Sequence, residues 1–158
     1  ILLDRLGIVG GGFLNTAIGI GALSGSLLVA SWGTRRGRGK FLVIASLVFP
    51  SAILGFSFSR VFALSLICLA IAGTALVSQN ATMNTLIQHA TPDALRGRVL
   101  SLYTLMFFGT APFTALQAGA LAQALGPAWG VAIGAAIALA FALALLIFAP
   151  QMRRFEAN

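Results

Sequence analysis

The feature that most constrains this chain is a series of long apolar runs separated by short polar connections. Five of these runs are each long enough, at about 20 mostly apolar residues, to cross the hydrocarbon core of a bilayer as a helix. They cover residues 10–32, 41–58, 61–88, 99–125 and 128–150. Because lipid offers no hydrogen-bonding partner, a chain that crosses it must satisfy its own backbone, and a helix does so even where glycines interrupt the run. The sequence therefore predicts an all-α membrane protein, a bundle of five transmembrane helices.

The composition agrees with lipid as the solvent for these runs. Of the 158 residues, 59% are hydrophobic and 8% are charged, whereas a soluble domain carries about 25% charged residues. The mean hydropathy is +0.99, so the chain lacks the polar side chains that a water-facing surface needs. The net charge of +7 comes from short clusters of cations between apolar runs. These clusters form no basic face, so we expect the lipid bilayer as a partner and no nucleic acid.

The cations are divided unequally between the two ends of the predicted helices. Counted along alternating connections, eight fall on one side and two on the other. The eight are Arg35, Arg36, Arg38, Lys40, Arg96, Arg98, Arg153 and Arg154, and the two are Arg5 and Arg60. Because positively charged connections stay in the cytoplasm, we expect the connections 33–40 and 89–98 and the C-terminus to be cytoplasmic. The N-terminus is then outside, and the chain is a multi-pass protein of the cell membrane.

Residues suited to catalysis or metal binding are few and scattered. The chain has one histidine, one cysteine and three acidic residues, with no pairing that favours nucleophilic catalysis or metal ligation. Cys68 lies inside an apolar run, where packing is the simplest role. His89 lies at the predicted cytoplasmic edge, where it is either a solvated residue or a proton relay. We therefore expect no enzymatic activity, no metal and no cofactor.

The connection after the third apolar run is the most polar stretch in the middle of the chain. Thr91 is suited to cap a helix start, Pro92 to the first helical position, and Asp93 to the positive end of the helix dipole. Arg96 and Arg98 would then lie at the level of the lipid headgroups. Two interpretations are open: the segment anchors the topology, or it is a gate element that pairs with another loop in one transport state.

Two sequence motifs resemble the major facilitator superfamily of transporters. Residues 85–126 are similar to the stretch that joins the tenth and eleventh helices of its exporters, above all in the enterobactin-exporter-like group of bacterial efflux proteins. That group's pattern, P-x-x-x-R-G-R-v-x-s-l, is matched by Pro92, Arg96, Gly97, Arg98, Val99, Ser101 and Leu102. The segment "RRGRGK" at 35–40 resembles the superfamily's cytoplasmic loop motif, G-x-L-a-D-R-x-G-R-[KR]. Arg35, Gly37 and Arg38 fit R-x-G-R, while Thr34 replaces the motif's Asp and Ala30 its leading Gly.

The resemblance implies that the five helices are helices eight to twelve of a twelve-helix transporter, a partial C-terminal half of that fold. It implies an exporter of small molecules, of drug or siderophore type, in the bacterial inner membrane, working by alternating access and proton antiport. The partners would be the missing N-terminal half, a small-molecule substrate and protons. The residues assigned to a cytoplasmic gate or anchor are Arg35, Gly37, Arg38, Asp93, Arg96, Gly97 and Arg98. Since the three carboxylates lie outside the apolar runs, the proton-binding group would belong to the missing portion.

The second half of the third run, residues 73–88, is unusually polar for a membrane helix. At 100° per residue its hydroxyl-bearing and its amide-bearing side chains form two stripes. The first stripe contains Thr74, Ser78, Thr82 and Thr85, and the second contains Asn80, Asn84 and Gln88. Polar groups in lipid are costly unless they face protein or water. We therefore assign Gln79, Asn80 and Asn84 to substrate binding, with hydrogen bonds between helices as the alternative.

Small residues in the first and fourth runs favour close helix packing. Gly21 and Gly25 form a GxxxG motif, and Gly109 and Gly119 belong to a small-residue face in the fourth run. This packing either allows sliding between the two halves of a transporter or is static. Pro112 is expected to kink its helix.

A second function class stays open at this point: a small integral membrane subunit or assembly factor that transports nothing. A water-accessible polar stripe in the third run would favour the transporter, whereas a stripe packed wholly against protein would favour the subunit.

Overall fold

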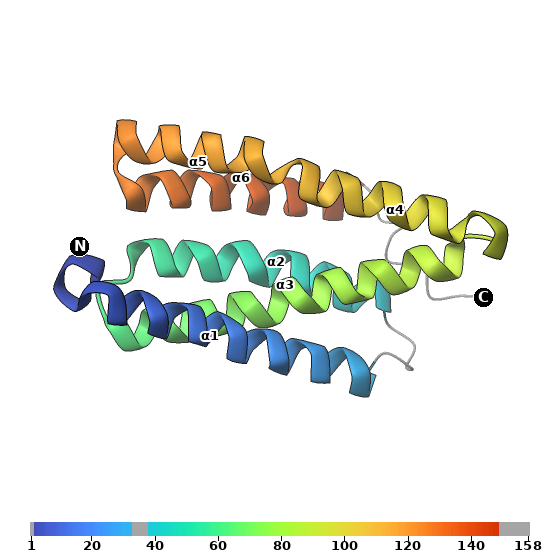
Figure 1. Ribbon diagram of the computed structural model, residues 1–158, viewed down its shortest axis with the longest axis horizontal. Helices are drawn as coiled ribbons and strands as arrows, with labels where there is room; N and C mark the ends of the chain where they lie inside the picture. Colours follow the sequence, from blue (N-terminus) through green and yellow to red (C-terminus); the bar gives the residue numbers. More distant parts are fainter. Residues whose placement is uncertain (1, 33–37, 149–158) are drawn as a thin grey trace.

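The computed structural model describes residues 2–32 and 38–148, and all of its regular elements there are helices. Their order along the chain is α1 (Leu2–Trp32), α2 (Arg38–Phe58), α3 (Phe62–Ala90), α4 (Asp93–Gly109), α5 (Ala111–Leu125) and α6 (Pro127–Phe148). The chain alternates direction through the bundle, so that the end of α1, the start of α2 and the turn between α3 and α4 lie at one end (Figure 1). The turn between α5 and α6 lies at the opposite end.

Five helical segments are long and apolar enough to cross a membrane. They are Gly10–Ser31, Phe41–Phe58, Phe62–Ala90, Asp93–Leu125 and Pro127–Ile147, the fourth being α4 and α5 together. The predicted fold class, an all-α membrane bundle of five spanning helices, is confirmed. The fourth segment begins earlier than the expected residue 99, because the polar turn of residues 93–98 is itself helical.

The fourth span is interrupted near its middle. α4 ends at Gly109 and α5 begins at Ala111, with Pro112 in its first turn. Hydrogen bonding continues on both sides, since Thr110 N–H donates to the Met106 carbonyl at 3.2 Å and its own carbonyl accepts from Thr114 N–H at 3.0 Å. Pro112 has no N–H for the carbonyl four residues earlier, which is the physical reason for a break at this place.

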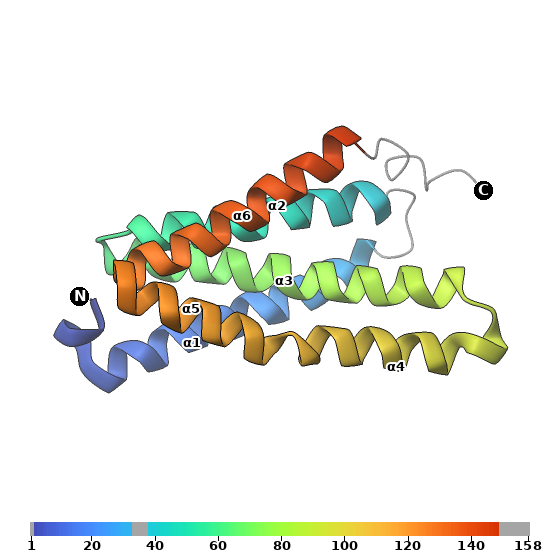
Figure 2. The same cartoon turned by 90° about the horizontal axis from the view of Figure 1, so that it is seen from above.

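The helices pack as a chain of neighbours rather than as a closed ring. α1 and α2 both lie against α3, α6 lies against α2, and α5 lies against α6. α4 lies beside α3 at the turn that joins them, and the two move apart toward α5 in Figure 1, while Figure 2 shows the bundle turned by 90°. α3 is therefore the central helix, and one of its faces borders a pocket whose other walls come from α2, α4 and α6.

Most of the buried side chains among the described residues are small. The buried hydrophobic residues are Ala17, Ala45, Leu69, Ala72, Ala75, Ala132, Ala135 and Ala142. Large apolar side chains such as Leu27, Phe113 and Ile147 are about 70% exposed. None of the span Asp93–Leu125 is buried. In a soluble protein the large apolar side chains would be buried. Here they are exposed, as expected where lipid is the solvent and helices are held together by close approach of their backbones.

Candidate functional site

The contact between α1 and α3 depends on glycine in both helices. A Cβ atom added at Gly21 would collide with the carbonyl oxygen of Ala70, and one added at Gly25 would lie 2.5 Å from that of Thr74. Gly73 on α3 meets the backbone of α1 in the same way. The two predicted packing glycines of α1 therefore lie directly in a helix crossing, where any side chain would push the backbones apart.

The hydroxyl-bearing stripe of α3 faces this crossing or bonds to its own helix. Ser78 and Thr82 are buried, and the Ser78 Oγ donates to the Gly25 carbonyl of α1 at 3.3 Å. Thr74 and Thr85 donate to carbonyls one turn earlier in α3, at 2.9 and 2.8 Å. The hydroxyls of Thr74, Ser78 and Thr85 are thus satisfied by protein, which is the ordinary role of such residues in membrane helices.

The adjacent face of α3 lines a cavity of about 470 Å³. Leu76, Gln79, Asn80 and Met83 project into it from α3, at the spacing of one helix face. Its other walls come from α2, α6 and, through Phe107, α4. The walls are mostly apolar, and the volume falls in the range of pockets that bind small organic molecules. Two of the three residues assigned to substrate binding from the sequence, Gln79 and Asn80, therefore meet at one cavity.

Three residues give the cavity its polar groups: Ser46 on α2 and the two amides on α3. The Ser46 hydroxyl donates to the Val43 carbonyl at 2.9 Å, which leaves its oxygen as an acceptor. The Gln79 carboxamide makes no hydrogen bond to the described residues. Asn80 Oδ1 accepts a hydrogen bond of 3.3 Å from the Tyr103 hydroxyl of α4. No charged side chain lines the described walls, and three phenylalanines, at positions 49, 107 and 141, contribute rings.

The third residue assigned to substrate binding, Asn84, lies outside the cavity. It is exposed, and its Oδ1 accepts from Gln88 Nε2 at 3.5 Å, one turn further along α3. The amide-bearing stripe therefore divides: its member nearest the middle of the helix faces the cavity, while the two nearer its end face outward.

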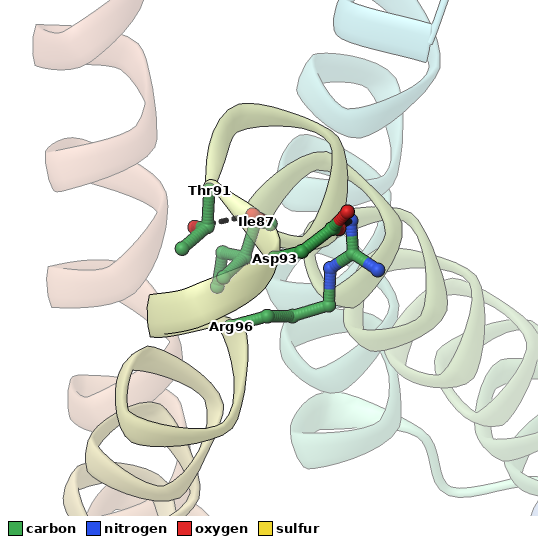
Figure 3. A network of polar contacts seen from close by, with 4 residues as sticks. All are labelled: Ile87, Thr91, Asp93 and Arg96. Atoms are coloured by element: carbon green, nitrogen blue, oxygen red, sulfur yellow. Dashed lines mark hydrogen bonds and ion pairs between the residues drawn. The ribbon is translucent and has the colours of Figure 1, made fainter.

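The polar turn after α3 holds itself together locally (Figure 3). Thr91 does not cap α4 as expected: its Oγ1 donates back to the Ile87 carbonyl at 2.7 Å and so closes the end of α3. Pro92 stands at the cap position of α4 and makes no side-chain cap. Asp93 begins the helix, and its carboxylate pairs with Arg96 at 2.6 Å. Because Asp93 is 88% exposed, this ion pair adds little to stability.

The remaining gate or anchor residues are placed only in part. Gly97 and Arg98 are exposed on α4, and no atom lies within 4 Å of a Cβ added at Gly97. Arg38 begins α2. Arg35 and Gly37 lie outside the described residues. Pairing between this turn and the connection 33–40 stays a prediction.

The predicted packing glycines of the fourth span have no neighbour. A Cβ added at Gly109 or at Gly119 would meet nothing within 4 Å among the described residues. Their small size is not used by contacts within this bundle, unlike that of the α1 glycines.

Sequence reasoning overlooked Tyr103 and the aromatic walls of the cavity. Tyr103 is the one tyrosine of the chain. A tyrosine inside an apolar run usually has a hydrogen-bond partner for its hydroxyl, so it could have been predicted to meet a polar residue. The phenylalanines carry no such signal, because the chain has 12 of them and most ring positions in a membrane helix face lipid.

Comparison with known proteins places the chain in a family. A family model described as "transmembrane secretion effector", within the major facilitator superfamily, matches residues 7–158. The chain belongs to this family. The prediction of a major facilitator superfamily protein is thereby confirmed, while its branch and the numbering of its helices stay predictions. A multi-pass membrane protein follows from the family together with the five apolar spans.

A curated relative is named for a sugar, not for a drug or a siderophore. It is the "D-xylose transporter" of Levilactobacillus brevis, 32% identical over 95 residues, which cover 60% of this chain and 21% of that protein. The matched part is thus about a fifth of the relative's length. No solved structure matches.

Proposed function

We propose that this chain is the C-terminal part of an exporter that moves small molecules of drug or siderophore type across the bacterial inner membrane. The observation that carries the proposal is the cavity beside α3, in which two carboxamides lie among apolar walls within a family of membrane transporters. Alternating access would rock this bundle against the N-terminal half of the protein. The C-terminus and the turn after α3 would lie in the cytoplasm.

The chemistry of the cavity favours a drug-like substrate over a sugar. A sugar presents a hydroxyl on nearly every carbon, and each hydroxyl left unpaired in an apolar site costs binding free energy. The cavity supplies two amides and one hydroxyl oxygen against walls of leucine, alanine and phenylalanine. A mostly apolar molecule with few polar groups therefore matches it better than xylose, the compound in the relative's name.

Proton coupling would depend on a group outside this bundle. Among the described spanning residues the one carboxylate is Asp93, at the very start of its span and paired with Arg96. We infer that the N-terminal half supplies the proton site. Asn84, exposed on α3, would face that half and contact substrate from the open side. The residues after α1 and after α3 would form the cytoplasmic gate.

The alternative, a membrane subunit without a transport path, has one observation against it. In such a subunit the polar face of α3 would be packed against protein throughout, as its hydroxyl stripe is. The amide face instead borders a cavity of about 470 Å³.

Accumulation of dyes in an efflux-deficient bacterium tests the proposal. Cells that express the full-length transporter should retain several-fold less Nile red than cells with an empty vector, and a protonophore should abolish the difference. The paired change Gln79→Leu and Asn80→Leu should restore accumulation, while Thr85→Ala, which removes a hydroxyl bonded to its own helix, should not. Unchanged dye levels together with uptake of D-xylose would overturn the proposal.

A further inference from the structure

Tyr103 connects α4 to the cavity without lining it. Its hydroxyl donates to Asn80 Oδ1 at 3.3 Å, and its ring stacks on Phe107 with centroids 6.3 Å apart and planes at 29°. Phe107 is the one cavity-lining residue from α4. The stacked ring thus holds the hydroxyl in place, on a helix that otherwise meets α3 sparsely.

The hydrogen bond from Tyr103 favours one orientation of the Asn80 amide, because a phenolic hydroxyl donates more strongly than it accepts. A carboxamide has one acceptor oxygen and two N–H donors. With Oδ1 turned to the tyrosine, the free groups are the Nδ2 hydrogens, which no described residue accepts. The residue that borders the cavity therefore offers it donors. Without the tyrosine hydroxyl, this preference is lost and the amide offers either end.

An oriented donor in an apolar cavity selects its ligand. A ligand with a carbonyl, ether or ring-nitrogen acceptor would pair with the Asn80 N–H, whereas a ligand without an acceptor would leave that N–H desolvated and unpaired. The described walls contain no charged side chain to balance a charged ligand. The three rings at positions 49, 107 and 141 favour an aromatic body.

We propose that Tyr103 is a positioning residue: it favours the orientation of the Asn80 carboxamide in which the N–H donors are free, so that the cavity prefers neutral aromatic compounds carrying a hydrogen-bond acceptor. This inference rests on the proposed function, because it names the ligand chemistry of the same cavity.

A pair of probes matched in size tests the inference on the full-length transporter purified in detergent. 9-Fluorenone carries a carbonyl acceptor, and fluorene has the same ring system without one. We expect fluorenone to bind about fivefold to tenfold more tightly, which is the loss that one unpaired buried donor causes. In Tyr103→Phe, which keeps the ring stack, this ratio should fall to about twofold or less, with fluorene affinity little changed. Ser101→Ala is the matched control, because it removes a hydroxyl of α4 that bonds to its own helix at Arg98.

A double-mutant cycle separates positioning from a general effect on folding. Asn80→Leu should also abolish the preference for fluorenone, and adding Tyr103→Phe to it should change neither affinity. The inference is overturned if the wild-type protein binds neither probe or does not prefer fluorenone, or if Tyr103→Phe keeps the wild-type ratio. These binding results are independent of the dye accumulation described above. If the protein prefers fluorenone but exports no dye, only the exporter proposal is overturned.

Discussion

At the scale of single residues, the firmest structural statement concerns the glycines of α1. Gly21 and Gly25 are four residues apart on one face of α1, and α3 crosses α1 at these two residues. The GxxxG spacing is sufficient to identify them from the sequence. It does not identify Gly73, their counterpart on α3, because no second small residue marks the same face at that spacing and the partner helix is some fifty residues away.

Replacing Gly21 by valine should separate α1 from α3. The new side chain would collide with the Ala70 carbonyl, and overpacking of this kind costs about 1–3 kcal/mol. We expect a clear fall in the thermal unfolding temperature of the detergent-solubilised protein, measured by size-exclusion after heating. Gly19→Val is the matched control, since no atom lies within 4 Å of its added Cβ. Equal stability of the two variants would contradict the helix crossing described here.

The contact between Tyr103 and Asn80 illustrates what a sequence leaves undetermined at this scale. Both residues are conspicuous as polar groups in apolar runs, and on that ground alone the sequence predicts a substrate contact at Asn80. Their pairing depends on how far α4 rotates after the turn at Thr91, where the hydroxyl bonds back to α3 instead of capping α4. The sequence does not reveal the position of α4 after this turn, and so does not reveal that the two residues meet.

At the scale of elements, the apolar runs were sufficient to predict the helices, and the exceptions have local causes. Run length and hydropathy predict five spans, and five are present. The two prolines within spans differ: α2 continues through Pro50, whereas the fourth span breaks at Thr110 ahead of Pro112. α2 is packed on both sides, by α3 and α6, while the fourth span has no buried residue. Both prolines remove a backbone donor, and the helix that continues through its proline is the one with packing neighbours on both sides, which the sequence does not reveal.

Replacing Pro112 by alanine should join α4 and α5 into one straight helix. The restored N–H would donate to the carbonyl four residues earlier. Spin labels at the exposed positions Leu102 and Leu116 would then lie about 21 Å apart along the axis, at 1.5 Å per residue. Pulsed electron resonance should give a longer and narrower distance distribution than in the wild type. Pro127→Ala is the control, because a proline at the first position of α6 blocks no helical hydrogen bond. A distribution unchanged by Pro112→Ala would mean that packing, not proline, causes the break.

At the scale of the whole molecule, the bundle is asymmetric in what it buries. α3 is enclosed by α1 and α2, while the span from Asp93 to Leu125 buries none of its side chains and exposes most of its large apolar ones and its two packing glycines. Lipid can cover such a surface as well as protein can. Gly109 and Gly119 favour protein over lipid as the cover of this surface, since small residues allow a close backbone approach that lipid contact does not require.

The orientation of the bundle provides the last prediction, because it joins the charge pattern to the fold. The helix ends next to the arginine-rich connections all lie at one end of the bundle, and the turn at Gly126, between α5 and α6, lies at the other. Cationic connections stay cytoplasmic, so a green fluorescent protein fused after Asn158 should fluoresce, and alkaline phosphatase at the same point should be inactive. Phosphatase inserted at Gly126 should be active, which controls for expression and export. Active phosphatase after Asn158 would reverse the bundle in the membrane and place the cavity's gate on the wrong side for export.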